Sequence, residues 1–152
     1  MPEKSILQIS RREALALGAA GAALALGLPS VAFAEGEADA IVAEFAGGAA
    51  PQTGRVTLDA PAEAADGSAV QIAISVESPM TADDYVTSVV LIGEGNPVPK
   101  VGEFHFSPLS GSAQISLRIR LAKTQRVLAV AKMKDGSVFM DVKTVKVAAG
   151  GC

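Results

Sequence analysis

The chain has 152 residues, of which 49% are hydrophobic and only 4% aromatic, and its formal net charge is −3. The first 34 residues hold three of the 13 basic and two of the 16 acidic residues, so residues 35–152 carry a net charge of −4. A mildly acidic chain without basic, aromatic-rich stretches is not expected to bind nucleic acid, and residues 35–152 suffice for one small domain with a core of Val, Ile, Leu and Ala.

Residues 1–34 have the pattern of an export signal. Arg11 and Arg12 precede an uncharged run of Ala, Leu and Gly over residues 14–28, and a small-x-small site follows that ends at Ala34. The apolar run is about 15 residues long, which is short for a hydrocarbon core of about 30 Å and disfavours an uncleaved anchor.

The paired arginines match a twin-arginine signal in part, because the apolar pair that usually follows them is replaced by Glu13-Ala14. An ordinary secretory signal is the alternative. Both signals predict cleavage after Ala34, a periplasmic location, and no membrane attachment after cleavage.

Residues 35–147 are expected to form the domain. Ile41, Val42 and Phe45 fall on one face at helical spacing, which predicts a helix over residues 38–46 that ends at Gly47-Gly48. Seven segments have the composition and alternation of strands: 55–58, 71–77, 85–92, 101–106, 114–121, 127–133 and 138–147. Residues 61–67 are expected to form a turn.

The apolar phase of the last predicted strand changes along its length. Val138, Met140 and Val142 are in one phase and Val145 is in the other, so a β-bulge is expected near residues 143–144. Short strands with regular turns favour an all-β fold. The predicted fold is an immunoglobulin-like antiparallel β-sandwich of about seven strands with a short N-terminal helix and a flexible C-terminal arm, and a barrel is the alternative.

The residue types present do not assemble a catalytic or metal-binding motif. The only histidine, His105, stands between two phenylalanines, and strand alternation turns it outward. One histidine and one cysteine are too few ligands for a copper or zinc site, so neither a metal nor a separate cofactor is expected. Arg118 and Arg120 share a predicted exposed face, which is either solvated or available to an anion or a partner.

The only cysteine, Cys152, follows Gly150 and Gly151 beyond the last predicted strand. We expect residues 148–152 to form a flexible arm, because glycine lacks side-chain bulk and has wide backbone freedom. An unpaired cysteine in an oxidising compartment indicates either a reactive thiol or an intermolecular disulfide.

This tail resembles that of the SoxY family, the sulfur-carrier subunits of the thiosulfate-oxidising Sox system. The family's tail reads Gly-Gly-Cys-Gly-Gly, and Gly150, Gly151 and Cys152 match its first three positions. Either two glycines follow Cys152 in the whole protein or this member has a shorter arm. The length and strand pattern of residues 35–152 also fit the family.

The resemblance implies a carrier rather than an enzyme, with thiosulfate-derived sulfur held covalently on Cys152 in a complex with SoxZ. The c-type cytochrome SoxAX would load the thiol and the hydrolase SoxB would release sulfate. The sulfane dehydrogenase SoxCD would act in systems that possess it. The alternatives are a non-catalytic periplasmic interaction module that uses Cys152 for an intermolecular disulfide, and a small enzyme or metal-binding domain.

Overall fold

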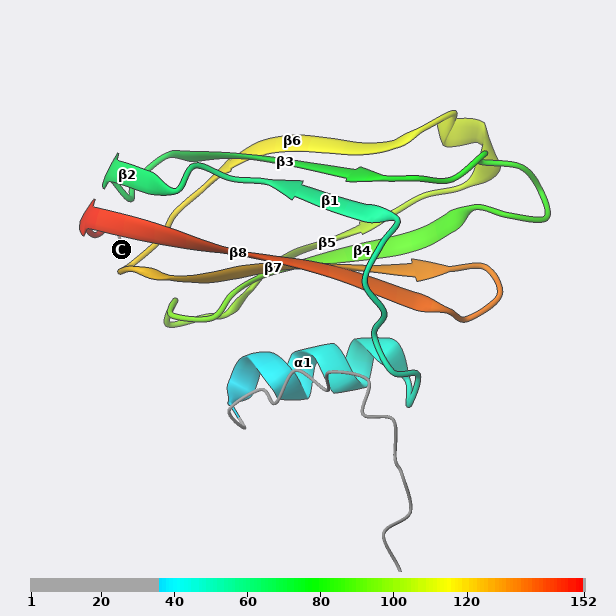
Figure 1. The fold of residues 1–152 in the computed structure, drawn as a ribbon, viewed down its shortest axis with the longest axis horizontal. Coiled ribbons are helices and arrows are strands. Elements are labelled where there is room, and N and C mark those ends of the chain that lie inside the picture. The colour runs from blue at the N-terminus through cyan, green and yellow to red at the C-terminus, as the bar shows by residue number, and fades with distance from the viewer. Residues whose placement is uncertain (1–35, 152) are drawn as a thin grey trace, which may run out of the picture. The chain divides into compact units, whose positions relative to one another are not determined.

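Two β-sheets and one helix make up the computed structural model, which describes residues 36–151 (Figure 1). The elements are α1 (Glu37–Ala46), β1 (Val56–Asp59), β2 (Glu63–Asp66), β3 (Val70–Val76), β4 (Val86–Gly93), β5 (Lys100–His105), the 3-10 turn η1 (Pro108–Ser110), β6 (Ala113–Ile119), β7 (Gln125–Met133) and β8 (Val138–Ala149). One sheet has the order β1-β3-β6, and the other has the order β2-β8-β7-β4-β5.

Some predictions lie outside the described residues. They are the signal at residues 1–34 with Arg11, Arg12 and the cleavage site after Ala34, and the position of Cys152 itself. Within residues 36–151, no helix has the length and apolar character that a membrane span requires.

The core lies between the two sheets. Ile72 and Ile74 on β3 meet Val89 and Leu91 on β4 and Val127 on β7, and all five are at most 2% exposed. Burying a side chain of this size contributes about 1.5–3 kcal/mol. Since both sheets supply one face to a single core, the predicted immunoglobulin-like sandwich is confirmed and the barrel alternative is wrong.

A second apolar cluster lies on the outer face of the five-stranded sheet, which α1 covers (Figure 1). Val42 of α1 packs in this cluster with Val90 and Leu128. The central strands β4 and β7 are therefore buried on both faces, which explains their nearly continuous apolar sequences. As predicted, the helix ends at Gly47, whose φ of 62° is left-handed.

The phase change in β8 does not come from a bulge, so that prediction is wrong. The pairing of β8 with β7 runs without a shift from Val145 opposite Gln125 to Val138 opposite Lys132. Val138 belongs to the cluster under α1, whereas Val145 belongs to the core between the sheets. The apolar residues of the first phase, which ends at Val142, pack under α1, and those of the second phase pack between the sheets. The apolar side chains therefore change faces along a regular strand.

The predicted turn at residues 61–67 is also wrong, because it contains a strand. This strand, β2, pairs in parallel with β8, with Glu63 opposite Lys146 and Asp66 opposite Ala149. The described sandwich thus has eight strands where about seven were predicted, and β2 adds one parallel pair to the antiparallel arrangement. This pairing carries β8 to Ala149, so the strand includes the first two residues of the predicted arm, 148 and 149.

Replacing Leu128 by alanine tests the packing of α1 on the outer face of the five-stranded sheet. Leu128 is fully buried beneath α1, so the cavity should lower the free energy of unfolding by about 2–5 kcal/mol, as measured by urea denaturation. Leu109, which is 97% exposed, is the matched control, and Leu109→Ala should change the value by less than about 0.5 kcal/mol. Equal effects of the two substitutions would contradict the described packing.

Candidate functional site

The chain leading to Cys152 is held against the domain by backbone hydrogen bonds. The Gly67 amide donates to the Ala149 carbonyl (2.7 Å), the Leu121 amide donates to the Gly67 carbonyl (2.8 Å), and the Gly151 amide donates to the Leu121 carbonyl (3.0 Å). Through these bonds each of three backbone segments is connected to the other two. We call Gly67, residues 121–122 and residues 149–151 the tail junction.

Glycine is required in the tail junction because its backbones approach very closely. A Cβ atom on Gly150 would lie 2.1 Å from the Ala122 carbonyl oxygen, and one on Gly151 would lie 2.2 Å from the carbonyl carbon of Gly67. Side chains do not tolerate such distances. The two glycines predicted to give the arm flexibility therefore have a packing role in this structure, while their flexibility stays a prediction.

The tail junction lies where the chain crosses between the sheets. Residue 67 belongs to the connection from β2 to β3, and residues 121–122 belong to the connection from β6 to β7. Both connections pass close to the C-terminal end of β8 (Figure 1). Leu121 is fully buried in the core between the sheets. The exit of the tail is therefore hydrogen-bonded to a connection that is anchored in the core.

A polar network supports the connection that carries Leu121. The Asn96 side chain donates to the Arg120 carbonyl (2.8 Å) and accepts from the Ala122 amide (3.0 Å). Gln125, only 6% exposed, donates to the Asn96 side-chain oxygen (2.9 Å) and accepts from the Gly95 amide (2.8 Å). The turn between β4 and β5 thus braces the tail junction.

Charged groups flank this network. Arg126 donates two hydrogen bonds to the Glu94 carboxylate, at 2.7 and 2.6 Å, and this guanidinium lowers the pKa of Glu94 below its ordinary value. Beside Gly67, hydrogen bonds from Ser68 lower the pKa of Asp66. Both carboxylates therefore remain ionised at neutral pH and hold the connections next to the tail junction.

The other predicted candidates do not join the tail junction in one site. His105 is exposed, as predicted, with its Nε2 3.7 Å from an oxygen of Glu103. Arg118 and Arg120 are also exposed, and Arg118 donates to the Gln71 side chain at 3.4 Å. In residues 36–151, no three His, Cys, Asp or Glu side chains gather as a metal site would require.

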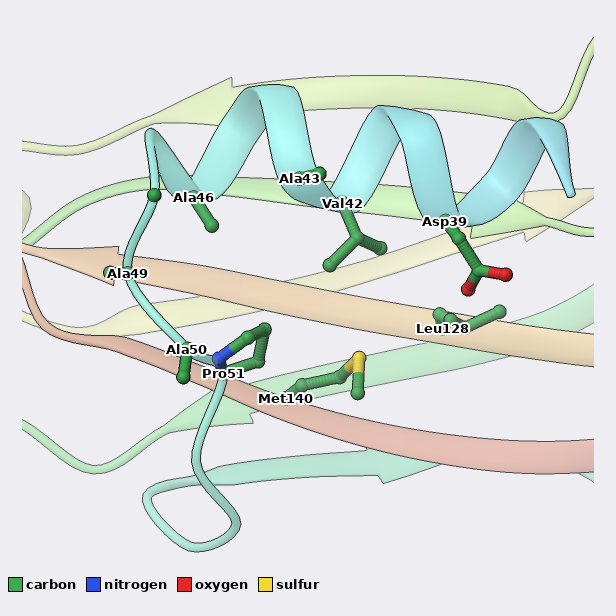
Figure 2. A pocket seen from close by; sticks show the side chains of 10 residues that line it. Asp39, Val42, Ala43, Ala46, Ala49, Ala50, Pro51, Leu128 and Met140 are labelled. Carbon is green, nitrogen blue, oxygen red and sulfur yellow. The ribbon is translucent and has the colours of Figure 1, made fainter. Parts of the chain in front are cut away.

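An apolar hollow lies between α1 and the five-stranded sheet (Figure 2). It has a volume of about 470 Å³, and its lining includes Val42, Ala46, Leu128, Met140 and the Asp39 carboxylate. That carboxylate accepts a hydrogen bond from the Gly36 amide at the start of the helix, 3.2 Å away. Its one acid is therefore used in capping α1, and the hollow offers apolar contact rather than chemistry.

Comparison with known protein families identifies the chain. The family model described as "Sulfur oxidation protein SoxY" matches residues 42–152, which include all of the sandwich and the tail. The chain belongs to the SoxY family. The resemblance seen in the Gly-Gly-Cys tail is thereby confirmed over most of the chain. No match was found among curated proteins.

Solved structures agree with this assignment. The sulfur carrier protein SoxY from Chlorobium limicola f thiosulfatophilum has 26% identity and a TM-score of 0.61, over 72% of this chain and 90% of that chain. The E23A superoxide reductase (neelaredoxin) from Ignicoccus hospitalis has 23% identity and a TM-score of 0.56, over 75% and 89% of the two chains. The superoxide reductase likeness shows a shared fold alone, whereas the SoxY structure agrees with the family match.

The Glu94–Arg126 pair predicts a pH dependence of stability in this SoxY family member. Because the folded-state pKa of Glu94 is lowered, its contribution is present above the unfolded value of about 4.3 and is lost as pH falls through the folded value. Glu94→Gln should therefore lower the free energy of unfolding by up to about 1 kcal/mol at pH 7, since each side chain is about a third exposed.

The measurement is urea denaturation of both proteins at pH 7 and at pH 3. The difference between wild type and Glu94→Gln should shrink at pH 3, because this pH lies below the unfolded-state pKa of about 4.3, so the unfolded wild-type chain binds a proton at residue 94. A difference that is as large at pH 3 as at pH 7 would show that the charge of Glu94 contributes nothing.

Proposed function

We propose that this chain is a covalent sulfur carrier of the Sox system, with Cys152 as the point of attachment. The observation that carries the proposal is the family match, which extends through the Gly-Gly-Cys tail to residue 152. The related structure is itself described as a sulfur carrier protein. The lone cysteine next to two glycines is the group of this chain best suited to form a reversible bond to sulfur.

In the loading step, the Cys152 thiol would lose its proton and form a sulfur–sulfur bond to the outer sulfur of thiosulfate. This bond formation is an oxidation that releases two electrons, which a c-type cytochrome such as SoxAX would accept. The product is a cysteine S-thiosulfonate. Water would then cleave its sulfane–sulfonate bond at the hydrolase SoxB, giving sulfate, a proton and a cysteine persulfide, which SoxCD would oxidise where it is present.

The chain itself contributes attachment and presentation in this scheme, and its partners contribute the catalysis. We propose that it acts in the periplasm after cleavage of its signal at Ala34, in a complex with SoxZ. The tail junction supports this division of roles, because hydrogen bonds and close contacts tie the backbone next to Cys152 to the domain. A carrier needs such a base from which its loaded end can be offered to several enzymes.

Replacing Cys152 by serine tests the proposal. The variant replaces one sulfur atom by oxygen, beyond the last described residue, so folding and SoxZ binding should be unchanged while thiosulfate-dependent respiration is abolished. Thermal unfolding and copurification with SoxZ are the controls, and oxygen uptake with thiosulfate is the readout. Unchanged respiration would refute the carrier role, and loss of only a disulfide-linked dimer would favour the interaction module.

A further inference from the structure

We propose that Gly67, in the turn between β2 and β3, is a positioning residue for Cys152. Its importance for sulfur transfer depends on the proposed carrier function, but its effect on the position of the tail does not. Gly67 is 85 positions away from Cys152 in the sequence, and no motif connects the two. The structure brings its backbone against the last described residue before the cysteine.

Gly67 contacts both other segments of the tail junction. A Cβ atom at this position would lie 2.2 Å from the Leu121 carbonyl oxygen, 2.9 Å from a methyl carbon of Val147 and 3.0 Å from the Gly151 nitrogen. The first contact is with backbone that is attached to a buried core residue, so it cannot move aside easily. Any side chain at residue 67 would therefore push the tail and the β6–β7 connection apart.

Close approach, not backbone conformation, is the reason for glycine here. Gly48, Gly54, Gly111 and Gly136 have positive φ angles and open space where a Cβ would stand. Gly67 shows the opposite combination, because its φ lies outside the left-handed range and other atoms fill the space where its Cβ would stand. An ordinary turn glycine is explained by its conformation, whereas Gly67 is explained by the backbone that lies against it.

This contact determines where the tail leaves the domain. With the Gly67–Ala149 and Gly151–Leu121 hydrogen bonds formed, the backbone is held to the domain up to Gly151, the residue before the cysteine. If both bonds are lost, the free segment begins several residues earlier and the thiol samples a larger volume. Gly67 thus controls the spread of positions open to Cys152.

The test uses a nitroxide label on Cys152, which is the only cysteine of the chain and is therefore labelled selectively. The electron paramagnetic resonance spectrum of the wild type should contain a component of restricted motion. Gly67→Ala should lose that component while circular dichroism shows that the sandwich is retained. A structural defect remote from the tail would not change the motion of this label.

The matched control is Gly102→Ala, because the nearest atom to a Cβ there is a ring carbon of Phe104 at an ordinary 3.5 Å. Its spectrum should equal that of the wild type. If Gly67→Ala does not fold, Gly151→Ala decides, since its Cβ would meet Gly67 at 2.2 Å from a position beyond β8. That variant should also lose the restricted component.

The proposal is overturned if the wild-type label is already fully mobile, or if a folded Gly67→Ala or Gly151→Ala protein keeps the wild-type spectrum. These outcomes do not depend on sulfur chemistry. A restricted label that Gly67→Ala releases, together with unchanged respiration of the Cys152→Ser strain, would retain the positioning role and refute the carrier role. A label that stays restricted in folded Gly67→Ala, together with loss of respiration in the Cys152→Ser strain, would retain the carrier role and refute the positioning role.

Discussion

Burial of β4 and β7 on both faces is the constraint on which the rest of the structure depends. Their side chains point alternately into the core between the sheets and into the cluster beneath α1, so the five-stranded sheet needs both the second sheet and the helix as cover. β8 pairs with β7, and β2 pairs with β8. The position of the tail is therefore set by a strand that is held in register by pairing with β7, which is buried on both faces.

The same constraint explains the last strand. Val138 and Val145 are both fully buried, although they face opposite sides of the sheet. In a sheet with one covered face, such a change would need an extra residue in the strand. Here the cover itself changes along the strand, from α1 to the second sheet, and the backbone stays regular. The tail then begins next to the core rather than on an outlying loop.

Much of the fold was predictable because strand alternation and helical spacing are local signals. The strand at 114–121 and the helix at 38–46 needed only neighbouring residues, and both are present within one or two positions. β2 was not predictable, since Glu63-Ala64-Ala65-Asp66 has neither β-branched nor aromatic residues, and its strand structure comes from pairing with β8. The prediction of a bulge was wrong because α1, which is far from β8 in the sequence, determines which face of the first part of β8 is buried.

The candidate site divides in the same way. Cys152 and its two glycines could be recognised from residue type and order, since a lone thiol after glycines carries chemical meaning by itself. The role of Gly67 could not, because it arises from backbones that meet across 84 positions of sequence between residues 67 and 151. Glycines that are needed for close approach look the same in sequence as glycines that make a tail flexible.

The carrier role is tested most directly by the intact mass of the protein purified from thiosulfate-grown cells, with and without reductant. Our account predicts mass additions of sulfur or thiosulfonate that reductant removes and that peptide mapping assigns to Cys152. The same measurement would reveal any residues that follow Cys152. A bare thiol or a plain disulfide dimer, unchanged by thiosulfate and its conjugating cytochrome, would contradict the carrier role.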